Sequence, residues 1–130
     1  MGKIMVRLDY VWLDGYKPTP NIRTKAQVVP DGFSGKVEDA PLWGFDGSST
    51  QQAEGHDSDC ILRPVRMYRN PLNEDGYLVL CDVQTRAGEV HATNTRALID
   101  EAAAEEYWFG FEQEYVLMNT NGRPVGFPDG

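Results

Sequence analysis

Two glutamates stand two residues apart in an aromatic stretch of the sequence. Glu112 and Glu114 lie within residues 108–117, where most other side chains are aromatic or branched aliphatic. Such side chains are typical of a strand, in which residues two apart share a face and stand about 6–7 Å apart. Paired carboxylates in a half-buried strand need compensation, which oxygen-preferring cations such as Mg²⁺ and Mn²⁺ provide. The spacing suits a metal site, but alternation is the ordinary pattern of a strand with one solvated face, so that face is the simpler interpretation of these residues taken alone.

A second stretch whose residues could take part in a reaction is residues 43–50, which read Trp-Gly-Phe-Asp-Gly-Ser-Ser-Thr. Asp46 lies there between aromatic and small residues, where a backbone can approach a ligand closely and a carboxylate can be partly desolvated. Such an acid can act as a base or bind a cation. Asp-Gly-Ser-Ser is also ordinary turn chemistry, so a plain loop is the simpler interpretation of this stretch taken alone.

Length and composition describe one globular domain, or one small domain with part of another. The chain has 130 residues, of which 41% are hydrophobic and 25% are charged. Its net charge of −8 and the absence of a basic stripe argue against binding to nucleic acids or to an anionic membrane. No apolar run reaches the length of a membrane span, and residues 1–7 contain no signal-peptide core. Cys60 and Cys81 lack CxxC spacing, which favours reduced, buried thiols in a cytoplasmic protein over a disulfide.

Most of the chain up to residue 89 has strand patterns separated by turns. Strands are expected at residues 5–13, 23–29, 60–65 and 77–85, with a short apolar piece at residues 42–45. Pro64 indicates an edge strand or a bulge. A helix is expected from Thr93 or Asn94 to about Glu106, followed by the carboxylate strand over residues 108–118. This order predicts an α+β fold with a mixed sheet, in a chain that stops inside a larger fold.

The two motifs, in this order, resemble those of the glutamine synthetases, and the similarity runs along the whole chain. Further matching segments are residues 10–15, 23–25, 52–55, 58–60 and 122–124. The pattern is similar to the eukaryotic-type class of the family, which some bacteria also have. The Trp-Gly-Phe-Asp-Gly form is similar to the bacterial members of that class.

The resemblance implies a β-grasp N-terminal domain, residues 1–90, and the first helix and strand of an α/β catalytic domain, residues 91–130. Family enzymes join glutamate and ammonia to form glutamine. ATP phosphorylates the side-chain carboxylate of glutamate, and ammonia displaces the phosphate. The resemblance further implies Mg²⁺ or Mn²⁺ as cofactor and identical subunits in a double ring, with each active site shared between neighbours.

The same resemblance assigns roles to four residues. Glu112 and Glu114 match two metal ligands of the family, one for each of two ions. Glu112 is thereby also close to the nucleotide, as is Trp108, for which a place in the core is the alternative. Asp46 matches the acid that binds ammonium and removes its proton in the active site of the neighbouring subunit. A base is needed because ammonium itself is not nucleophilic.

Ser49 and Asp59 are weaker candidates from the same loop region, with turn capping and solvation as the alternative. The family's later metal ligands and its arginine segments are not in this chain, and His56 and His91 do not match them. Because two carboxylates alone hold a metal weakly, this polypeptide alone is expected not to make glutamine. A γ-glutamyl ligase that uses another amine is one alternative. A non-catalytic β-grasp module that docks onto full-length subunits is another.

Overall fold

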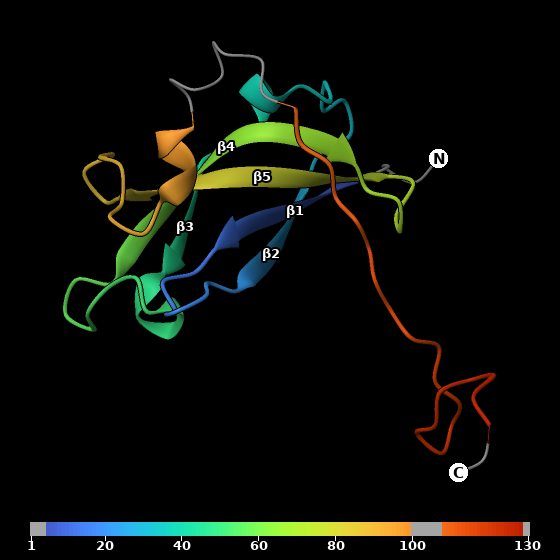
Figure 1. The fold of residues 1–130 in the computed structure, drawn as a ribbon. Coiled ribbons are helices and arrows are strands. Elements are labelled where there is room, and N and C mark those ends of the chain that lie inside the picture. Colours follow the sequence, from blue (N-terminus) through green and yellow to red (C-terminus); the bar gives the residue numbers. More distant parts are fainter. Residues whose placement is uncertain (1–4, 100–107, 129–130) are drawn as a thin grey trace.

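A five-stranded sheet forms the centre of the computed structural model, which describes residues 5–99 and 108–128 (Figure 1). Its strands are β1 (Val6–Leu13), β2 (Ile22–Val29), β3 (Trp43–Asp46), β4 (Asp59–Arg69) and β5 (Gly76–Thr85). The described residues also form short 3₁₀ helices, namely η1 (Val37–Asp39), η2 (Gly47–Thr50) and η3 (Thr95–Leu98). Within the described ranges no helix has the length and apolar character that a membrane crossing requires.

The sheet is mixed because β1 pairs with its two neighbours in opposite senses. The strand order is β2-β1-β5-β4-β3. β2 runs antiparallel to β1, and β5 runs parallel to it. β4 is antiparallel to β5, and β3 is antiparallel to β4, which places β3 at an edge. The predicted mixed sheet and the strands predicted before residue 89 are therefore confirmed, with β3 formed by the short apolar piece.

One face of this sheet carries the hydrophobic core. Because alternate residues of a strand share a face, the buried side chains follow a period of two along the strands. They are Leu8, Tyr10, Trp12, Val29, Phe45, Cys60, Leu62, Val79, Cys81 and Val83, with Ala40 from the loop after η1. The Tyr10 hydroxyl is satisfied within this core because it donates to the Pro41 carbonyl at 2.7 Å. Packing on this face thus fixes the positions of β1, β3 and β4 relative to one another.

Both cysteines are free and buried in this core, as the sequence predicts. They lie at different levels of the β4–β5 ladder, where Cys60 pairs with Thr85 and Cys81 pairs with Pro64. Burial raises the pKa of the Cys81 thiol to about 12. It also raises the pKa of the Cys60 thiol, with the neighbouring carboxylates adding to the effect. Both groups therefore remain neutral thiols at neutral pH.

Pro64 lies at a bulge in β4, beyond the part of that strand that pairs with β3. β3 pairs with β4 only from Asp59 to Leu62, and the register of β4 with β5 shifts between Pro64 and Arg66. A proline lacks the N–H that a regular ladder requires, and a bulge removes that requirement. β4 continues beyond its expected end at residue 65, because the pairing with β5 resumes after the bulge and runs to Arg69.

The opposite face of the sheet is partly covered by the chain that follows β5. Arg96 of η3 contacts the buried carboxylate of Asp82 at 3.1 Å, and Arg63 of β4 contacts the same carboxylate at 2.7 Å. A buried carboxylate requires such partners, so Asp82 anchors η3 to β5. A cavity of about 410 Å³ remains between η3 and the sheet, with mostly apolar walls that include Val11 and Leu80.

The helix expected from Thr93 or Asn94 falls only partly on described residues. Its start is η3, with Asn94 at the N-cap position but without a side-chain cap hydrogen bond. The Asn94 amide instead donates to the Val83 carbonyl at 3.2 Å, which binds this segment to the end of β5. The remainder of the expected helix, residues 100–106, lies outside the described residues.

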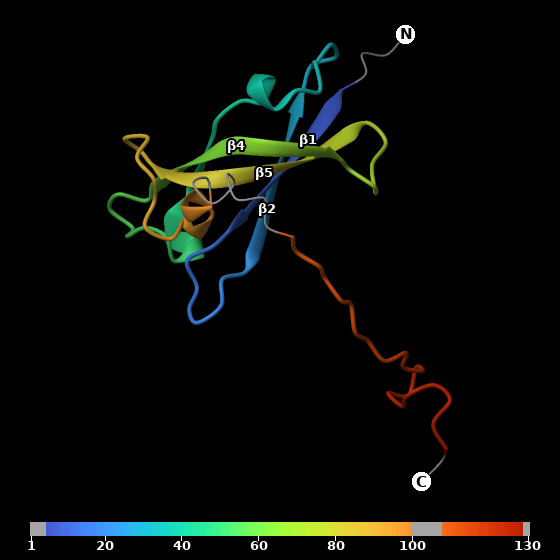
Figure 2. The same ribbon diagram turned by 45° about the horizontal axis from the view of Figure 1, so that its top comes forward.

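The strand expected over residues 108–118 does not form. These residues run as an extended segment that stands away from the sheet (Figures 1 and 2), and Met118 makes only an isolated bridge to Pro124. Trp108 and Phe111 are each 98% exposed. Strand propensity becomes a strand only when a neighbouring strand pairs with the backbone, and no described segment pairs with this one in a ladder.

Candidate functional site

Asp46 is the last residue of β3 and caps the short helix η2. Its Oδ1 atom accepts hydrogen bonds from the Ser48 hydroxyl at 2.7 Å and from the Ser48 backbone N–H at 2.9 Å. These bonds lower the pKa of Asp46, with the hydroxyl contributing most. The side chain is exposed, so an ionised carboxylate faces solvent at the sheet edge. Such a group can attract a cation and accept a proton from it.

The two weaker candidates lie beside Asp46. The Ser49 hydroxyl donates to the Asp46 carbonyl at 3.0 Å, which is the turn-capping role considered for it. Asp59 pairs with Asp46 across the β3–β4 ladder and lies 3.8 Å from Arg86. Cross-strand carboxylates repel each other, so a cation held near both would relieve unfavourable electrostatics. The fold therefore brings together Asp46 of β3, Ser49 of η2 and Asp59 of β4.

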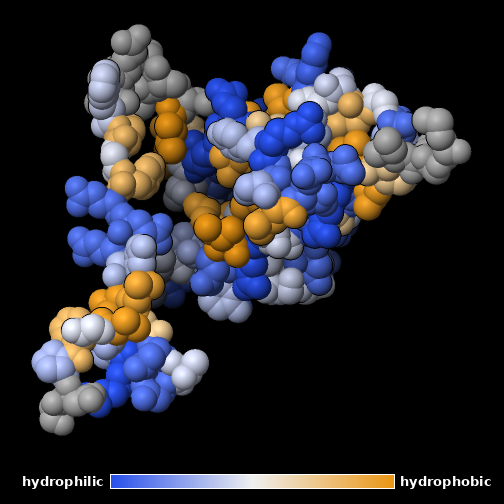
Figure 3. Space-filling model, turned by 90° about the vertical axis from the view of Figure 1, so that its right-hand side faces the viewer, coloured by the Kyte–Doolittle hydropathy of each residue, from blue (hydrophilic) through white to orange (hydrophobic). Residues whose placement is uncertain are grey.

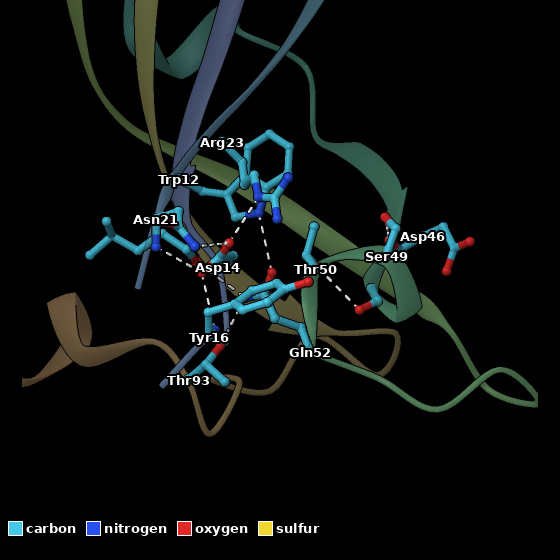
Figure 4. A network of polar contacts seen from close by, with 12 residues as sticks. Trp12, Asp14, Tyr16, Asn21, Arg23, Asp46, Ser49, Thr50, Gln52 and Thr93 are labelled. Carbon is cyan, nitrogen blue, oxygen red and sulfur yellow. Dashed lines mark hydrogen bonds and ion pairs between the residues drawn. The ribbon is translucent and has the colours of Figure 1, made fainter. Parts of the chain in front are cut away.

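The turn that carries Asp46 is packed tightly against β4. The Gly47 N–H donates to the Ser58 carbonyl at 2.7 Å, and the Gly47 carbonyl accepts from the Gln52 N–H at 2.9 Å. A Cβ atom at position 47 would lie 2.7 Å from the Cys60 sulfur, so this position has no room for a side chain. The backbone beside Asp46 is consequently held in one place while its carboxylate points outward (Figure 4).

A buried glutamine joins this turn to β1 and to the chain after β5 (Figure 4). The Gln52 Oε1 atom accepts from the Trp12 indole N–H at 3.2 Å, and its amide donates to the Leu13 carbonyl at 3.2 Å. The same amide donates to the Thr93 hydroxyl at 2.8 Å. Residues 52–55 match the family pattern, but a glutamine in a polar loop gives no sign of burial before the fold is known.

Asp14 forms a second buried polar centre next to the turn (Figure 4). Its carboxylate accepts from the Arg23 Nε at 2.8 Å, from the backbone and the side chain of Asn21, and from the Tyr16 N–H. Burial alone would raise the pKa of Asp14. The hydrogen bonds outweigh burial and lower the pKa to about 2. Asp14 thereby holds the β1–β2 connection in place beside η2.

The stabilisation that Asp14 provides is expected to vanish between about pH 4 and pH 2. The folded-state pKa of about 2 lies below the ordinary value of 3.8, so ionised Asp14 favours the folded state. This contribution is complete above pH 4 and is lost as the pH falls through 2. Urea unfolding of the chain and of Asp14→Asn at several pH values measures it. The stability difference should be large at pH 5 and small near pH 2, with exposed Asp31→Asn as control. A difference that does not change with pH would contradict this assignment.

A shallow cavity of about 290 Å³ lies between this turn and β2. Its lining residues are Trp12, Arg23, Thr24, Lys25, Phe45, Asp46, Ser49 and Thr50. Both cations in its wall are already engaged. Arg23 binds Asp14, while the Lys25 ammonium donates to the Gly44 carbonyl at 2.8 Å and lies 4.3 Å from the centre of the Trp43 ring. The groups that this cavity offers to a ligand are therefore the Asp46 carboxylate and hydroxyl groups rather than a free positive charge.

The proposed metal ligands lie elsewhere. Glu112 and Glu114 are exposed on the extended segment, which stands apart from η2 in both ribbon views (Figures 1 and 2). Trp108 is exposed on the same segment, where apolar side chains are open to solvent (Figure 3). Across the two described ranges, no group of three or more His, Cys, Asp or Glu side chains could hold a metal ion. The metal and nucleotide roles of these residues therefore stay predictions.

Comparison with known proteins gives one consistent answer. Residues 5–86 match the family described as "Glutamine synthetase, beta-Grasp domain". The chain is 52% identical over 124 residues to a glutamine synthetase of Bradyrhizobium diazoefficiens, covering 94% of this chain and 35% of that protein. It is 49% identical over 126 residues to one of Rhizobium meliloti, covering 95% of this chain and 37% of that protein.

A more distant relative is glutamine synthetase 1, mitochondrial, of Drosophila melanogaster. The identity is 43% over 130 residues, covering 95% of this chain and 32% of that protein. The chain thus spans about a third of the length of these curated relatives. Since the family match covers the whole five-stranded sheet and the relatives match nearly all of the chain, the chain belongs to the glutamine synthetase family, and its sheet is the β-grasp domain of that family.

Proposed function

We propose that this chain is the N-terminal part of an ATP-dependent ligase that joins ammonia to glutamate through a γ-glutamyl phosphate. Its family membership supports this reaction class. The observation that carries the proposal is Asp46, an exposed and ionised carboxylate on a turn that the core holds rigid. This combination suits a group that acts on a small cation outside its own domain.

In this proposal Asp46 binds ammonium and removes its proton. Ammonium has no free electron pair, so it must lose a proton before nitrogen can attack the acyl phosphate. The lowered pKa keeps Asp46 negative and able to attract the cation. Its position at the end of edge strand β3 leaves it accessible to a second subunit. That accessibility supports a site shared between identical subunits, which we place in a double ring.

Glu112 and Glu114 would supply one ligand each to two divalent ions, Mg²⁺ or Mn²⁺, and Glu112 and Trp108 would contribute to the binding of ATP. Carboxylate oxygens are the donors that these ions prefer, and the ions neutralise phosphate charge when bound. The pair requires additional oxygen ligands, which the described residues do not provide. The two carboxylates would then bind and orient the ions, while Asp46 would accept the proton from ammonium.

The remaining parts of the proposal concern organisation and location. Residues 1–90 form the β-grasp domain, and residues 91–130 begin the catalytic domain. The exposed apolar side chains of the extended segment support this division, because such surface is normally covered. We place the protein in the cytoplasm, since its two cysteines are both free, as is usual in a reducing compartment.

The 130-residue chain alone is expected to make no glutamine, whereas a fusion that supplies the missing ligands is expected to be active. In the fusion, the chain continues into the remaining residues of the Bradyrhizobium relative. Glutamine synthesis and γ-glutamyl transfer are measured with Mg²⁺ and with Mn²⁺, and the intact mass is recorded on each sample.

Glu114→Ala in the fusion is the matched loss-of-ligand variant, and it should abolish the activity that the fusion gains. Activity of the chain at its own mass would contradict the expectation that it needs ligands from further residues. A folded but inactive fusion would contradict the ligase proposal. It would favour instead the non-catalytic β-grasp module that docks onto full-length subunits.

A further inference from the structure

Gln52 occupies a junction between three parts of the chain. Its side chain is 5% exposed and contacts β1 through Trp12 and Leu13 and the segment after β5 through Thr93. Its backbone N–H donates at 2.9 Å to the carbonyl of Gly47, the residue directly after Asp46. A single residue therefore connects the turn that presents Asp46 with the segment that leads toward Glu112 and Glu114.

All polar atoms of the Gln52 side chain take part in hydrogen bonds. The Gln52 amide has two N–H groups, one for the Leu13 carbonyl and one for the Thr93 hydroxyl, while its oxygen accepts from Trp12. The Thr93 hydroxyl in turn lies 2.9 Å from the His91 Nδ1 atom, which also accepts from the Thr93 backbone N–H at 3.2 Å. The hydrogen bonds therefore run in one direction, from the glutamine amide through the hydroxyl to the imidazole.

We propose that Gln52 is a positioning residue that holds the Asp46 turn in register with residues 91–99 through its hydrogen bond to Thr93. The inference rests on the proposed function, in which Asp46 serves a neighbouring subunit and the segment after residue 91 leads to the chain's own metal ligands. Gln52 thereby links the Asp46 turn, which serves the neighbouring subunit, to the segment that leads to the metal ligands of its own subunit.

The chemistry of the junction explains why a glutamine suits this position. A glutamate would retain the acceptor for Trp12 but would lose both N–H donors and add a buried charge. A methionine has similar length but makes none of these bonds. Both contacts join segments far apart in the sequence, but the contact with Trp12 is buried in the core, whereas the contact with Thr93 is only partly buried. Thr93 is consequently the better place to test coupling separately from core stability.

Thr93→Val removes the hydroxyl while keeping the shape of the side chain, and Thr93→Ser keeps the hydroxyl. In the 130-residue chain, amide hydrogen exchange of residues 47–52 is expected to be about fivefold faster in Thr93→Val. It should return to the original rate in Thr93→Ser. Exchange within β1 and β5 should be unchanged in both variants. Gln52→Met, which also removes the bond to Trp12, should speed exchange in the turn more than Thr93→Val does.

The same variants in the fusion enzyme give a second readout. Thr93→Val is expected to raise the KM for ammonium about fivefold while the KM for ATP stays unchanged, and Thr93→Ser should restore it. Unchanged exchange in the turn, or equal increases in both KM values, would overturn the positioning role. A fusion that makes no glutamine in any form would refute the proposed function, while the exchange measurement would still decide whether Gln52 positions the turn.

Discussion

Glutamine synthesis by the fusion enzyme is expected to fall about 10²–10⁴-fold when Asp46 is replaced by asparagine. Asparagine keeps the shape of the side chain, and its oxygen can still accept the hydrogen bonds from Ser48. It lacks the negative charge that attracts ammonium and the basicity that removes a proton. The fold should therefore survive while the chemistry is lost, and urea unfolding of the variant checks that it does.

A comparison of two nucleophiles, ammonia and hydroxylamine, distinguishes a general base at Asp46 from a purely structural role of this residue. Ammonia must be generated from its cation, whereas hydroxylamine is mostly neutral near pH 7 and depends less on a base. Asp46→Asn should therefore impair glutamine synthesis much more than transfer to hydroxylamine. Asp57→Asn, in the exposed loop that leads to β4, serves as control and should change neither reaction. Equal losses with both nucleophiles would contradict a base at Asp46.

The acid limb of the pH profile adds a further constraint. Hydrogen bonds from Ser48 hold the pKa of Asp46 below its ordinary value of 3.8. Protonation of Asp46 consequently removes base strength only below that pH, and no loss from this group is expected between pH 5 and 8. Any decline of the rate in that range must come from another titrating group.

The strands and the Asp46 turn could be predicted because their signals are local. Alternating apolar residues mark β1 and β5, and the run of small residues after Asp46 marks a turn. Pro64 could be assigned to an edge or a bulge but not to one of them. In the structure β3 pairs with β4 only from Asp59 to Leu62, and the register with β5 shifts between Pro64 and Arg66. Neither pairing can be known before the chain has folded.

The parts that sequence reasoning missed depend on distant partners. Residues 108–118 have strand composition, yet a strand also needs a second backbone beside it, and none of the described chain fills that role. Gln52 and Asp14 become important only because folding encloses them with Thr93 and Arg23. Burial of a polar side chain is a property of the whole sheet and leaves no pattern along the sequence.

The two turns that frame the candidate site contact each other at Gly15. Its N–H donates to the Thr50 carbonyl at 2.9 Å. A Cβ atom at this position would lie 2.1 Å from the carbonyl oxygen of Gln51 and 2.8 Å from its carbon. Both are backbone atoms, so a rotamer change cannot relieve the contact. Gln51 itself is in the left-handed region, with φ 58°, which leaves this backbone little freedom to move.

Gly15→Ala is therefore expected to lower the free energy of unfolding by about 2–4 kcal/mol, because the methyl group must push the two turns apart. Urea unfolding followed by tryptophan fluorescence measures the loss, and Trp12 reports from the same junction. Gly55→Ala is the matched control, since a Cβ atom there meets nothing within 4 Å. It should change the stability by less than about 0.5 kcal/mol. Equal unfolding midpoints for the two variants would show that the β1–β2 connection does not touch the Asp46 turn. In that case the rigid presentation of Asp46 would need another physical basis.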